Sequence, residues 1–216
     1  MRKAIVLLSG GLDSSTTLFL AKKKGYIVNC LIFDYGQRHK REIRSAKEIA
    51  KAAECKFEVI KIRFPWKGSS LLDKSKKVPE RKNLQGIPST YVPARNLIFL
   101  SFALSFAESQ NCAAIFIGAN QIDYSGYPDC RIGFYKALKT VIKKGTKTGV
   151  QGKPIKILTP IIKKTKSEII KLGLRLSVPY NLTWSCYKGM KKPCGKCDSC
   201  LLRAKGFRKA GVNDPL

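Results

Sequence analysis

A short apolar run that leads directly into a pair of glycines limits the fold of this chain most strongly. Residues 4–8 are apolar at every position, which is typical of a strand buried on both faces of a parallel sheet. The sequence Ser-Gly-Gly-Leu-Asp-Ser-Ser follows at residues 9–15. Basic residues at 22–24 and then Gly25 mark the end of the helix expected after this loop. The pattern predicts a strand, a glycine loop and a helix in immediate succession.

Strand-like and helix-like segments alternate along the rest of the chain. Further strands are predicted at residues 26–33, 57–62, 113–117 and 155–158. Further helices are predicted at residues 39–54, 95–109, 131–144 and 165–173, with a short one after residue 200. Strands that alternate with helices predict an α/β fold with an open, mostly parallel sheet.

Four segments of the chain have features that allow more specific predictions. Residues 95–109 are apolar nearly all round, which predicts a buried helix. Proline, glycine and lysine are frequent in residues 63–90, which predicts a long loop of the kind that covers a substrate. Residues 146–153 are expected to form a basic loop. Thr165 and Glu168 have the spacing of a capping box at the start of a helix.

Composition excludes several classes of protein. The 216 residues include 42 Lys and Arg against 14 Asp and Glu, a net charge of +28, but 44% of the chain is hydrophobic. That fraction is too high for a disordered basic tail. The chain has no apolar run of about 18 residues, and its first apolar run is too short for a signal peptide. We therefore expect a cytoplasmic protein with no membrane segment.

The basic excess is concentrated in one part of the chain. Residues 131–192 hold sixteen Lys and Arg and a single acid, Glu168. Such a stretch could contact nucleic acid. Few aromatic residues interleave with it, however, so a solvated basic surface is the favoured interpretation.

The glycine loop is predicted to bind phosphate. Gly10 and Gly11 let the backbone approach a ligand closely, and the helix beyond them presents free N–H groups at its positive end. The hydroxyls of the neighbouring serines add donors, so pyrophosphate is the expected ligand. Asp13 would orient Mg²⁺ or cap the helix. The alternative is a plain Gly-Gly turn with Asp13 or Ser14 as the N-cap.

Four of the eight cysteines are grouped near the end of the chain. They are Cys186, Cys194, Cys197 and Cys200, and the last three are spaced so that their thiolates can converge from one turn. Four thiolates without a nearby histidine favour one structural Zn²⁺ in a closed tetrahedral site. An iron–sulfur cluster or disulfides are the alternatives, and the expected reducing compartment weakens the disulfides.

Three further motifs follow predicted strands or begin a helix, where an open α/β sheet has its ligand crevice. They are Asp-Tyr-Gly-Gln-Arg-His at 34–39, Val-Pro-Ala-Arg-Asn at 92–96, and the polar, aromatic segment 118–131. Arg95 could clamp a phosphate or carboxylate, or pair with an acid as an ordinary helix-start residue. The segment 118–131 could bind a heterocycle or be a simple connector. The candidate substrate or catalytic residues are Asp34, Tyr35, Gln37, His39, Arg95, Asn96, Asp123, Tyr124, Tyr127, Asp129 and Arg131.

These motifs, in this order, resemble a known family. Residues 9–15 resemble the loop of the pyrophosphate-loop ATPases. Together with Asp-Tyr-Gly-Gln, Asp-Tyr-Ser-Gly-Tyr-Pro-Asp-Cys-Arg and the four-cysteine tail, they resemble the 7-cyano-7-deazaguanine synthase family of queuosine and archaeosine precursor synthesis. The similarity covers almost the whole chain. One departure is Ala94, at a position where glycine is common in the family.

The resemblance implies a Rossmann-like sheet of the adenine nucleotide alpha-hydrolase type, with strand order 3-2-1-4-5. It implies an ATPase domain at residues 1–180 and a zinc-binding tail at 181–216 packed on it. It also carries over the four grouped cysteines as zinc ligands. The ATP-binding residues that it implies are Leu8, Ser9, Gly10, Gly11, Leu12, Asp13, Ser14, Ser15, Thr16, Thr17 and Leu18.

The implied activity is a C–N bond-forming ligase reaction. ATP and Mg²⁺ would activate the carboxylate of 7-carboxy-7-deazaguanine by adenylylation, ammonia would give the amide, and a second activation would dehydrate the amide to the nitrile. The partners are then small molecules, and a homodimer is left open. The alternative is a pyrophosphate-loop ATPase that modifies tRNA directly.

Overall fold

The structure is a computed structural model that describes residues 2–80, 86–122 and 126–216. Its strands are β1 (Arg2–Leu7), β2 (Tyr26–Asp34), β3 (Lys56–Lys61), β4 (Ala114–Ile117) and β5 (Lys156–Leu158). Its α-helices are α1 (Leu12–Lys23), α2 (Arg41–Ala52), α3 (Arg95–Ser109), α4 (Ile132–Gly145), α5 (Lys147–Val150), α6 (Lys166–Arg175) and α7 (Asp198–Ala210). Two 3₁₀ turns, η1 (Pro128–Cys130) and η2 (Tyr180–Leu182), complete the set.

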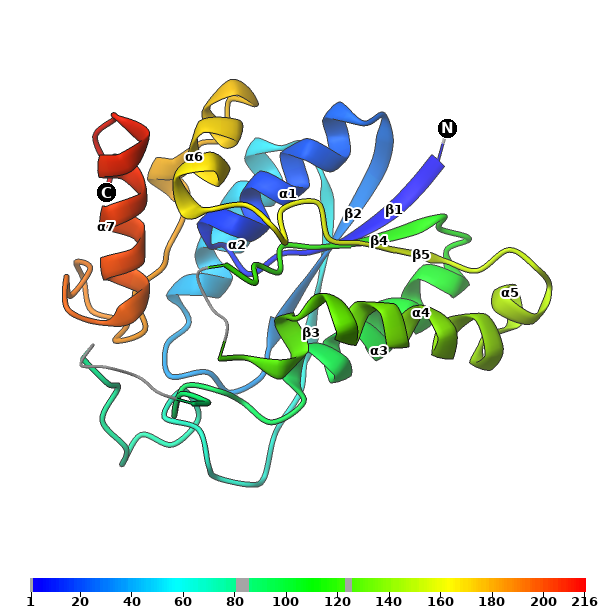
Figure 1. Ribbon diagram of the computed structural model, residues 1–216, viewed down its shortest axis with the longest axis horizontal. Coiled ribbons are helices and arrows are strands. Elements are labelled where there is room, and N and C mark those ends of the chain that lie inside the picture. Colours follow the sequence, from blue (N-terminus) through cyan, green and yellow to red (C-terminus); the bar gives the residue numbers. More distant parts are fainter. Residues whose placement is uncertain (1, 81–85, 123–125) are drawn as a thin grey trace.

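The strands form one parallel sheet in the order β3-β2-β1-β4-β5, which confirms the predicted order. Because β1 is central, both of its faces are buried. Val6 and its neighbours on one face pack under α1 and α2, whereas Ile5 and Leu7 face α3 and α4. Figure 1 shows the two helix pairs on opposite sides of the sheet. The uninterrupted apolar run at residues 4–8 is explained by this double burial.

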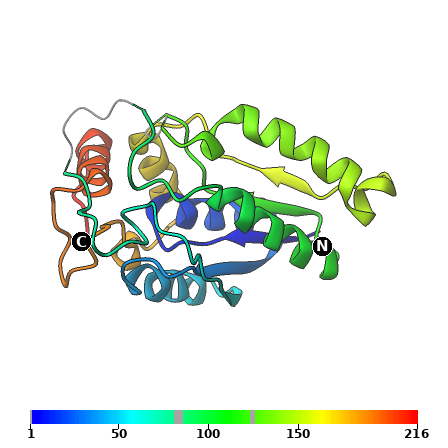
Figure 2. The same ribbon diagram turned by 90° about the horizontal axis from the view of Figure 1, so that it is seen from below.

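The C-terminal part packs against one end of these layers. Helix α7 lies beside α6, and Phe207 of α7 packs with Leu12 and Ile170 in a small separate core. Figures 1 and 2 both place α7 at the opposite end of the molecule from the start of β1. The contact with Leu12 matters because this residue begins α1, directly after the glycine loop.

Three local predictions need correction. Helix α3 has the predicted bounds but is not buried all round: Leu97 is 41% and Phe102 45% exposed. Only the face with Leu100 meets the sheet core. The basic segment 146–153 contains the short helix α5, capped by the Thr146 hydroxyl. Helix α7 begins inside the cysteine cluster rather than after it. The capping box of Thr165 and Glu168 is confirmed.

The long connection between β3 and α3 contains no helix or named strand in its described part, residues 62–80 and 86–94. Glu80 pairs with Cys197 in an isolated antiparallel bridge. This contact brings the connection to the cysteine cluster. None of the described helices combines the length and the hydropathy that a membrane crossing needs.

The backbone at residue 94 favours glycine over the alanine that this chain has there. Ala94 is the N-cap of α3 and has φ of 53°, in the left-handed region. An alanine side chain is strained there by about 1 kcal/mol, whereas glycine is not.

We expect Ala94→Gly to raise the free energy of unfolding by about 1 kcal/mol, because it removes this strain. Ala137→Gly is the matched control: Ala137 is exposed in the middle of α4 with ordinary helical geometry, so its replacement should lower stability by about 1 kcal/mol. Urea denaturation followed by circular dichroism measures both. Equal losses in the two variants would contradict the assignment of strain to residue 94.

Candidate functional site

The glycine loop lies directly against the backbone of α2. Gly10 has φ of +79°, and a Cβ at this position would lie 2.5 Å from the carbonyl oxygen of Glu42 and 2.6 Å from the amide nitrogen of Ala46. On its other side, the carbonyl of Gly10 accepts a 2.8 Å hydrogen bond from the Trp184 amide. Glycine is therefore required at residue 10, both by its dihedral angle and by the close approach of α2.

The loop presents the uncapped N-terminus of α1. Gly11 is the N-cap and supplies no side-chain hydrogen bond, so neither Asp13 nor Ser14 is the N-cap that the alternative interpretation required. The Ser14 hydroxyl lies 3.0 Å from the Ser9 hydroxyl and accepts from the Ser9 amide at 3.2 Å. Free N–H groups and hydroxyls at the positive end of a helix suit an anion such as pyrophosphate.

Asp13 faces the same space and is held by a distant lysine. Lys166, at the start of α6, donates to both carboxylate oxygens of Asp13 at 2.7 and 2.8 Å. Both side chains are largely buried. A carboxylate held in place beside an anion-binding helix end has the chemistry of a Mg²⁺ ligand, so the residues present fit a magnesium–phosphate group.

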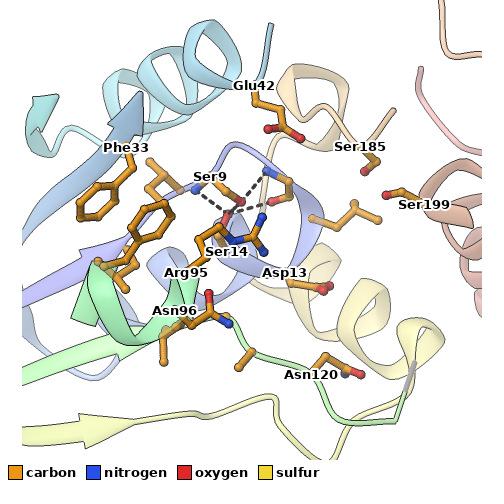
Figure 3. A pocket seen from close by; sticks show the side chains of 18 of the residues that line it. Ser9, Asp13, Ser14, Phe33, Glu42, Arg95, Asn96, Asn120, Ser185 and Ser199 are labelled. Atoms are coloured by element: carbon orange, nitrogen blue, oxygen red, sulfur yellow. Dashed lines mark hydrogen bonds between the residues drawn. The ribbon is translucent and has the colours of Figure 1, made fainter. Parts of the chain in front are cut away.

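A cavity of about 280 Å³ opens next to the loop, and Figure 3 shows the side chains around it. It lies where β1, β2 and β4 end, so it occupies the point at which the strand order reverses on either side of β1. This is the usual ligand position in open α/β sheets. From the expected ATP segment it is lined by Leu8, Ser9, Gly11, Leu12, Asp13 and Ser14.

The remaining residues of the expected ATP segment do not line the cavity. The hydroxyls of Ser15, Thr16 and Thr17 donate back into α1, and Leu18 is part of the core under α2. Gly10 shapes the loop without lining the cavity.

Aromatic side chains form one wall of the cavity. The rings of Phe33 and Phe99 are stacked, with centroids 4.0 Å apart and planes at 4°. Tyr35 packs on Phe99 with centroids 5.3 Å apart, and Tyr127 completes the wall. Flat apolar surfaces of this kind suit a planar heterocycle.

Arg95 supplies positive charge at the centre of the cavity. Its guanidinium donates to the Tyr35 hydroxyl at 3.2 Å and lies 5.7 Å from the centroid of that ring. Burial raises the pKa of Tyr35, against the opposing effect of Arg95, so this residue is a neutral phenol at physiological pH. Arg95 lies close to the loop in Figure 3, where a phosphate or carboxylate could reach it.

Of the other predicted residues, Asn96 and Gln37 line the cavity, and Asp129 supports it from behind. The Asp129 carboxylate accepts from the backbone amide of Asn96 at 3.0 Å, while the Asn96 side chain lines the cavity. Gln37 lines the cavity, and its side chain accepts from the Tyr35 amide at 2.9 Å and donates to the Phe33 carbonyl at 3.1 Å, which fixes the turn after β2. Asp129 does not line the cavity.

Several predicted residues lie elsewhere. Asp34 and the exposed Arg131 are outside the cavity lining. Asp123 and Tyr124 fall outside the described residues. His39 also does not line the cavity. It packs against Gly189, beside the cysteine cluster, and burial lowers its pKa.

Sequence reasoning missed Glu42 altogether. This residue is in the first turn of α2, and its carboxylate lines the cavity. Burial raises its pKa to about 7, although Arg95 acts in the opposite direction. Lys166, Phe33, Phe99 and Ser185 also line the cavity without having been predicted there.

The four grouped cysteines converge on one point. Their sulfur atoms all lie within 4.8 Å of one another. The amide of Cys194 donates to the Cys186 sulfur, and that of Cys197 to the Cys194 sulfur, each at 3.4 Å. N–H groups directed at sulfur favour the thiolate form, so the four residues could hold a metal ion as a complete ligand set.

Trp184 connects this cluster to the glycine loop. Its backbone amide donates to Gly10, and its indole N–H donates to the Cys186 carbonyl at 2.9 Å. The indole is 2% exposed, and the guanidinium of Arg41 lies 4.1 Å from the centroid of its ring. Trp184 thus contacts both the cysteine cluster, which could hold a metal, and the glycine loop, which could bind phosphate.

A family profile described as queuosine biosynthesis protein QueC matches residues 3–211. The chain belongs to the QueC family. A relative from Acetivibrio thermocellus, named 7-cyano-7-deazaguanine synthase, is 53% identical and covers 100% of this chain and 97% of its own. One of the same name from Thermoplasma acidophilum is 52% identical, covering 100% of this chain and 91% of its own.

Solved structures outside the QueC family share the fold at low identity. NMN synthetase from Francisella tularensis has a TM-score of 0.52 at 14% identity and covers 98% of this chain and 87% of its own. A 4-thiouridine synthetase in complex with RNA and ATP has a TM-score of 0.52 at 17% identity, covering 97% of this chain and 50% of its own. These likenesses establish the fold of this QueC member.

We expect Gly10→Ala to destabilise the chain by about 2–5 kcal/mol, since left-handed strain of about 1–2 kcal/mol adds to overpacking of about 1–3 kcal/mol against α2. Gly25→Ala is the matched control, because Gly25 has φ of +76° but nothing within 4 Å of its would-be Cβ. It should lose only the strain. Denaturant unfolding measures the difference, and equal losses would show that the contact with α2 contributes nothing.

Proposed function

We propose that this chain is an ATP-dependent 7-cyano-7-deazaguanine synthase, which converts 7-carboxy-7-deazaguanine and ammonia into the nitrile. The observation that carries the proposal is the end-to-end identity of 50–53% with relatives of that name. The cavity supports it independently, because an anion-binding helix end and an aromatic wall meet in one space.

The phosphates of ATP would lie at the glycine loop. The N–H groups of the first turn of α1 and the hydroxyls of Ser9 and Ser14 would donate to them. Asp13 would hold Mg²⁺, which supplies charge neutralisation on the phosphates when bound. Lys166 keeps the Asp13 carboxylate in place and adds a positive charge at this end of the cavity.

The 7-deazaguanine ring would pack against the aromatic wall. Phe33 and Phe99 offer a flat apolar surface, and the side-chain amides of Asn96 and Asn120 line the same cavity. The side-chain nitrogen of Asn96 already donates to the Asp129 carbonyl and the Cys130 sulfur. Its amide oxygen is therefore the atom that would accept from the N–H groups on the polar edge of a purine-like base. The carboxylate of the base would then point toward Arg95, which stabilises negative charge as the acid is activated.

The reaction needs positioning and charge stabilisation rather than a protein nucleophile. A carboxylate oxygen attacks the α-phosphorus of ATP, and pyrophosphate leaves toward the glycine loop. Ammonia then forms the C–N bond and AMP leaves with the electron pair of the C–O bond. A second activation, on the amide oxygen, lets loss of two N–H protons and of the activated oxygen complete the nitrile.

The cysteine cluster would have a structural role. Four thiolates complete the coordination of Zn²⁺ and leave no position for substrate. In this role residues 181–216 form a metal-stabilised tail on the ATPase domain of residues 1–180. The contacts of Trp184 with Gly10 and Cys186 support it, because they connect the tail to the loop.

The proposed activity is tested by incubating the chain with ATP, Mg²⁺, ammonium and 7-carboxy-7-deazaguanine, with mass spectrometry for products. We expect the amide first and then a nitrile that is lighter by one water. A reaction without ammonium is the control. If ATP is consumed only when tRNA is added and no nitrile forms, the chain is instead an ATPase that modifies tRNA directly.

Metal analysis should find about one zinc per chain, because the four thiolates form one closed site. Cys197→Ser should lose the metal, and the tail should then unfold because the bound metal no longer stabilises it. Cys112→Ser is the matched control, since Cys112 is also buried but lies outside the cluster, and it should keep its zinc. Iron with a visible absorbance band would contradict the assignment.

A further inference from the structure

Glu42 is an acid in the cavity that the proposed mechanism does not yet use. In the described part of the chain, Asp13 and Glu42 are the two acids that line the cavity. Asp13 is already bound by Lys166. No described residue donates a hydrogen bond to the Glu42 carboxylate. Figure 3 shows this carboxylate directed from α2 toward the middle of the pocket.

The position of Glu42 is fixed by the glycine loop. A Cβ on Gly10 would lie 2.5 Å from the carbonyl oxygen of Glu42, so the first turn of α2 packs directly against this loop. The neighbouring Ile43 is buried in the core between the sheet and helices α1 and α2. The carboxylate is thereby held next to the place where the phosphates of ATP, and hence the activated carbon of the substrate, would lie.

Its surroundings allow Glu42 to exchange a proton at physiological pH. Burial is the largest cause that raises its pKa to about 7, and the charge of Cys186 acts in the same direction while Arg95 opposes both. The other titratable or charged side chains that line the cavity are Asp13, Tyr35, Tyr127, Cys130, Lys166, Tyr187 and Arg203. Burial thus makes the Glu42 carboxylate a stronger base than an exposed glutamate, because the raised pKa favours proton uptake.

We propose that Glu42 accepts the proton released from nitrogen when ammonia reacts with the activated substrate. The inference rests on the proposed function. The nitrogen lone pair forms the C–N bond, and the C–O bond to the phosphoryl group breaks with its electron pair on the leaving AMP. One N–H proton passes to the Glu42 carboxylate and from there to water, which restores the base form.

The dehydration of the amide uses the same group a second time. When the amide oxygen is activated, the nitrogen loses one of its two protons, which Glu42 accepts and passes to water. The C–O bond then breaks with its electron pair on the oxygen that leaves with the phosphoryl group. The remaining N–H bond supplies the pair that completes the C≡N bond, and Glu42 accepts this second proton. Both stages release a proton at the same nitrogen, so one carboxylate in a fixed position serves both.

The test compares Glu42→Gln with the wild-type enzyme in the acid-to-amide and amide-to-nitrile reactions separately, at constant free ammonia. The glutamine keeps the shape but cannot accept a proton. We expect kcat to fall by about 10²–10⁴-fold in both reactions, the usual contribution of a general base. The KM for ATP should change little.

The pH profile distinguishes proton transfer from a structural role. Because the base form is active, wild-type kcat/KM should rise with pH through about 7. Glu42→Gln should lose this inflection, while Glu42→Asp should keep it at a lower rate. Glu48→Gln is the matched control: it changes an acid to an amide on the same helix, where Glu48 is 40% exposed and pairs with Arg44, and it should behave as wild type.

Four results would overturn the inference. The first is a kcat/KM of the wild-type enzyme that does not change with pH near 7, a measurement that needs no variant. The second and third are a near-wild-type rate in Glu42→Gln and a pH inflection that persists in this variant. The fourth is recovery of the variant's rate at high Mg²⁺, which would make Glu42 a metal ligand. In each case the wild-type enzyme still makes the nitrile. If the wild-type enzyme makes no nitrile, the proposed function itself fails.

Discussion

The contact between the glycine loop and the backbone of α2 is the constraint on which the site depends. It exists only because residue 10 has no side chain, and it fixes three things at once. The N-terminus of α1 is turned toward the ends of the strands, the first turn of α2 is brought beside the phosphate-binding candidate, and the Gly10 carbonyl is left to accept from Trp184. The ends of the sheet strands line the cavity, but the contact between Gly10 and α2 determines which other groups surround it.

Most of the architecture could be predicted because it follows from local patterns. The run at residues 4–8 indicated a strand buried on both faces, and the spacing of Thr165 and Glu168 indicated a helix start; both were correct. The burial of α3 was predicted wrongly because composition shows that a helix is apolar but not which neighbours cover it. Leu97 and Phe102 are exposed for that reason.

The site was only partly accessible to the same reasoning. Cysteine spacing is local enough to indicate a shared metal, and Arg95 was expected at the cavity from its place at a helix start. The pairing of Asp13 with Lys166 joins residues 153 positions apart, so no sequence window contains it. Glu42 was missed because a glutamate in the first turn of a helix is common. Its distinguishing property is the burial that raises its pKa, and the burial of a side chain is set by the folded chain rather than by the neighbouring sequence.

The position of Trp184 gives the molecule an internal optical reporter. The chain contains two tryptophans, and the other, Trp66, is 49% exposed whereas Trp184 is almost fully buried. The backbone amide of Trp184 bonds to Gly10 of the loop, and its indole N–H bonds to Cys186 of the cluster, with the Arg41 guanidinium over the ring. With Trp66 replaced by phenylalanine, the remaining tryptophan fluorescence would come from the single residue that contacts both the glycine loop and the cysteine cluster.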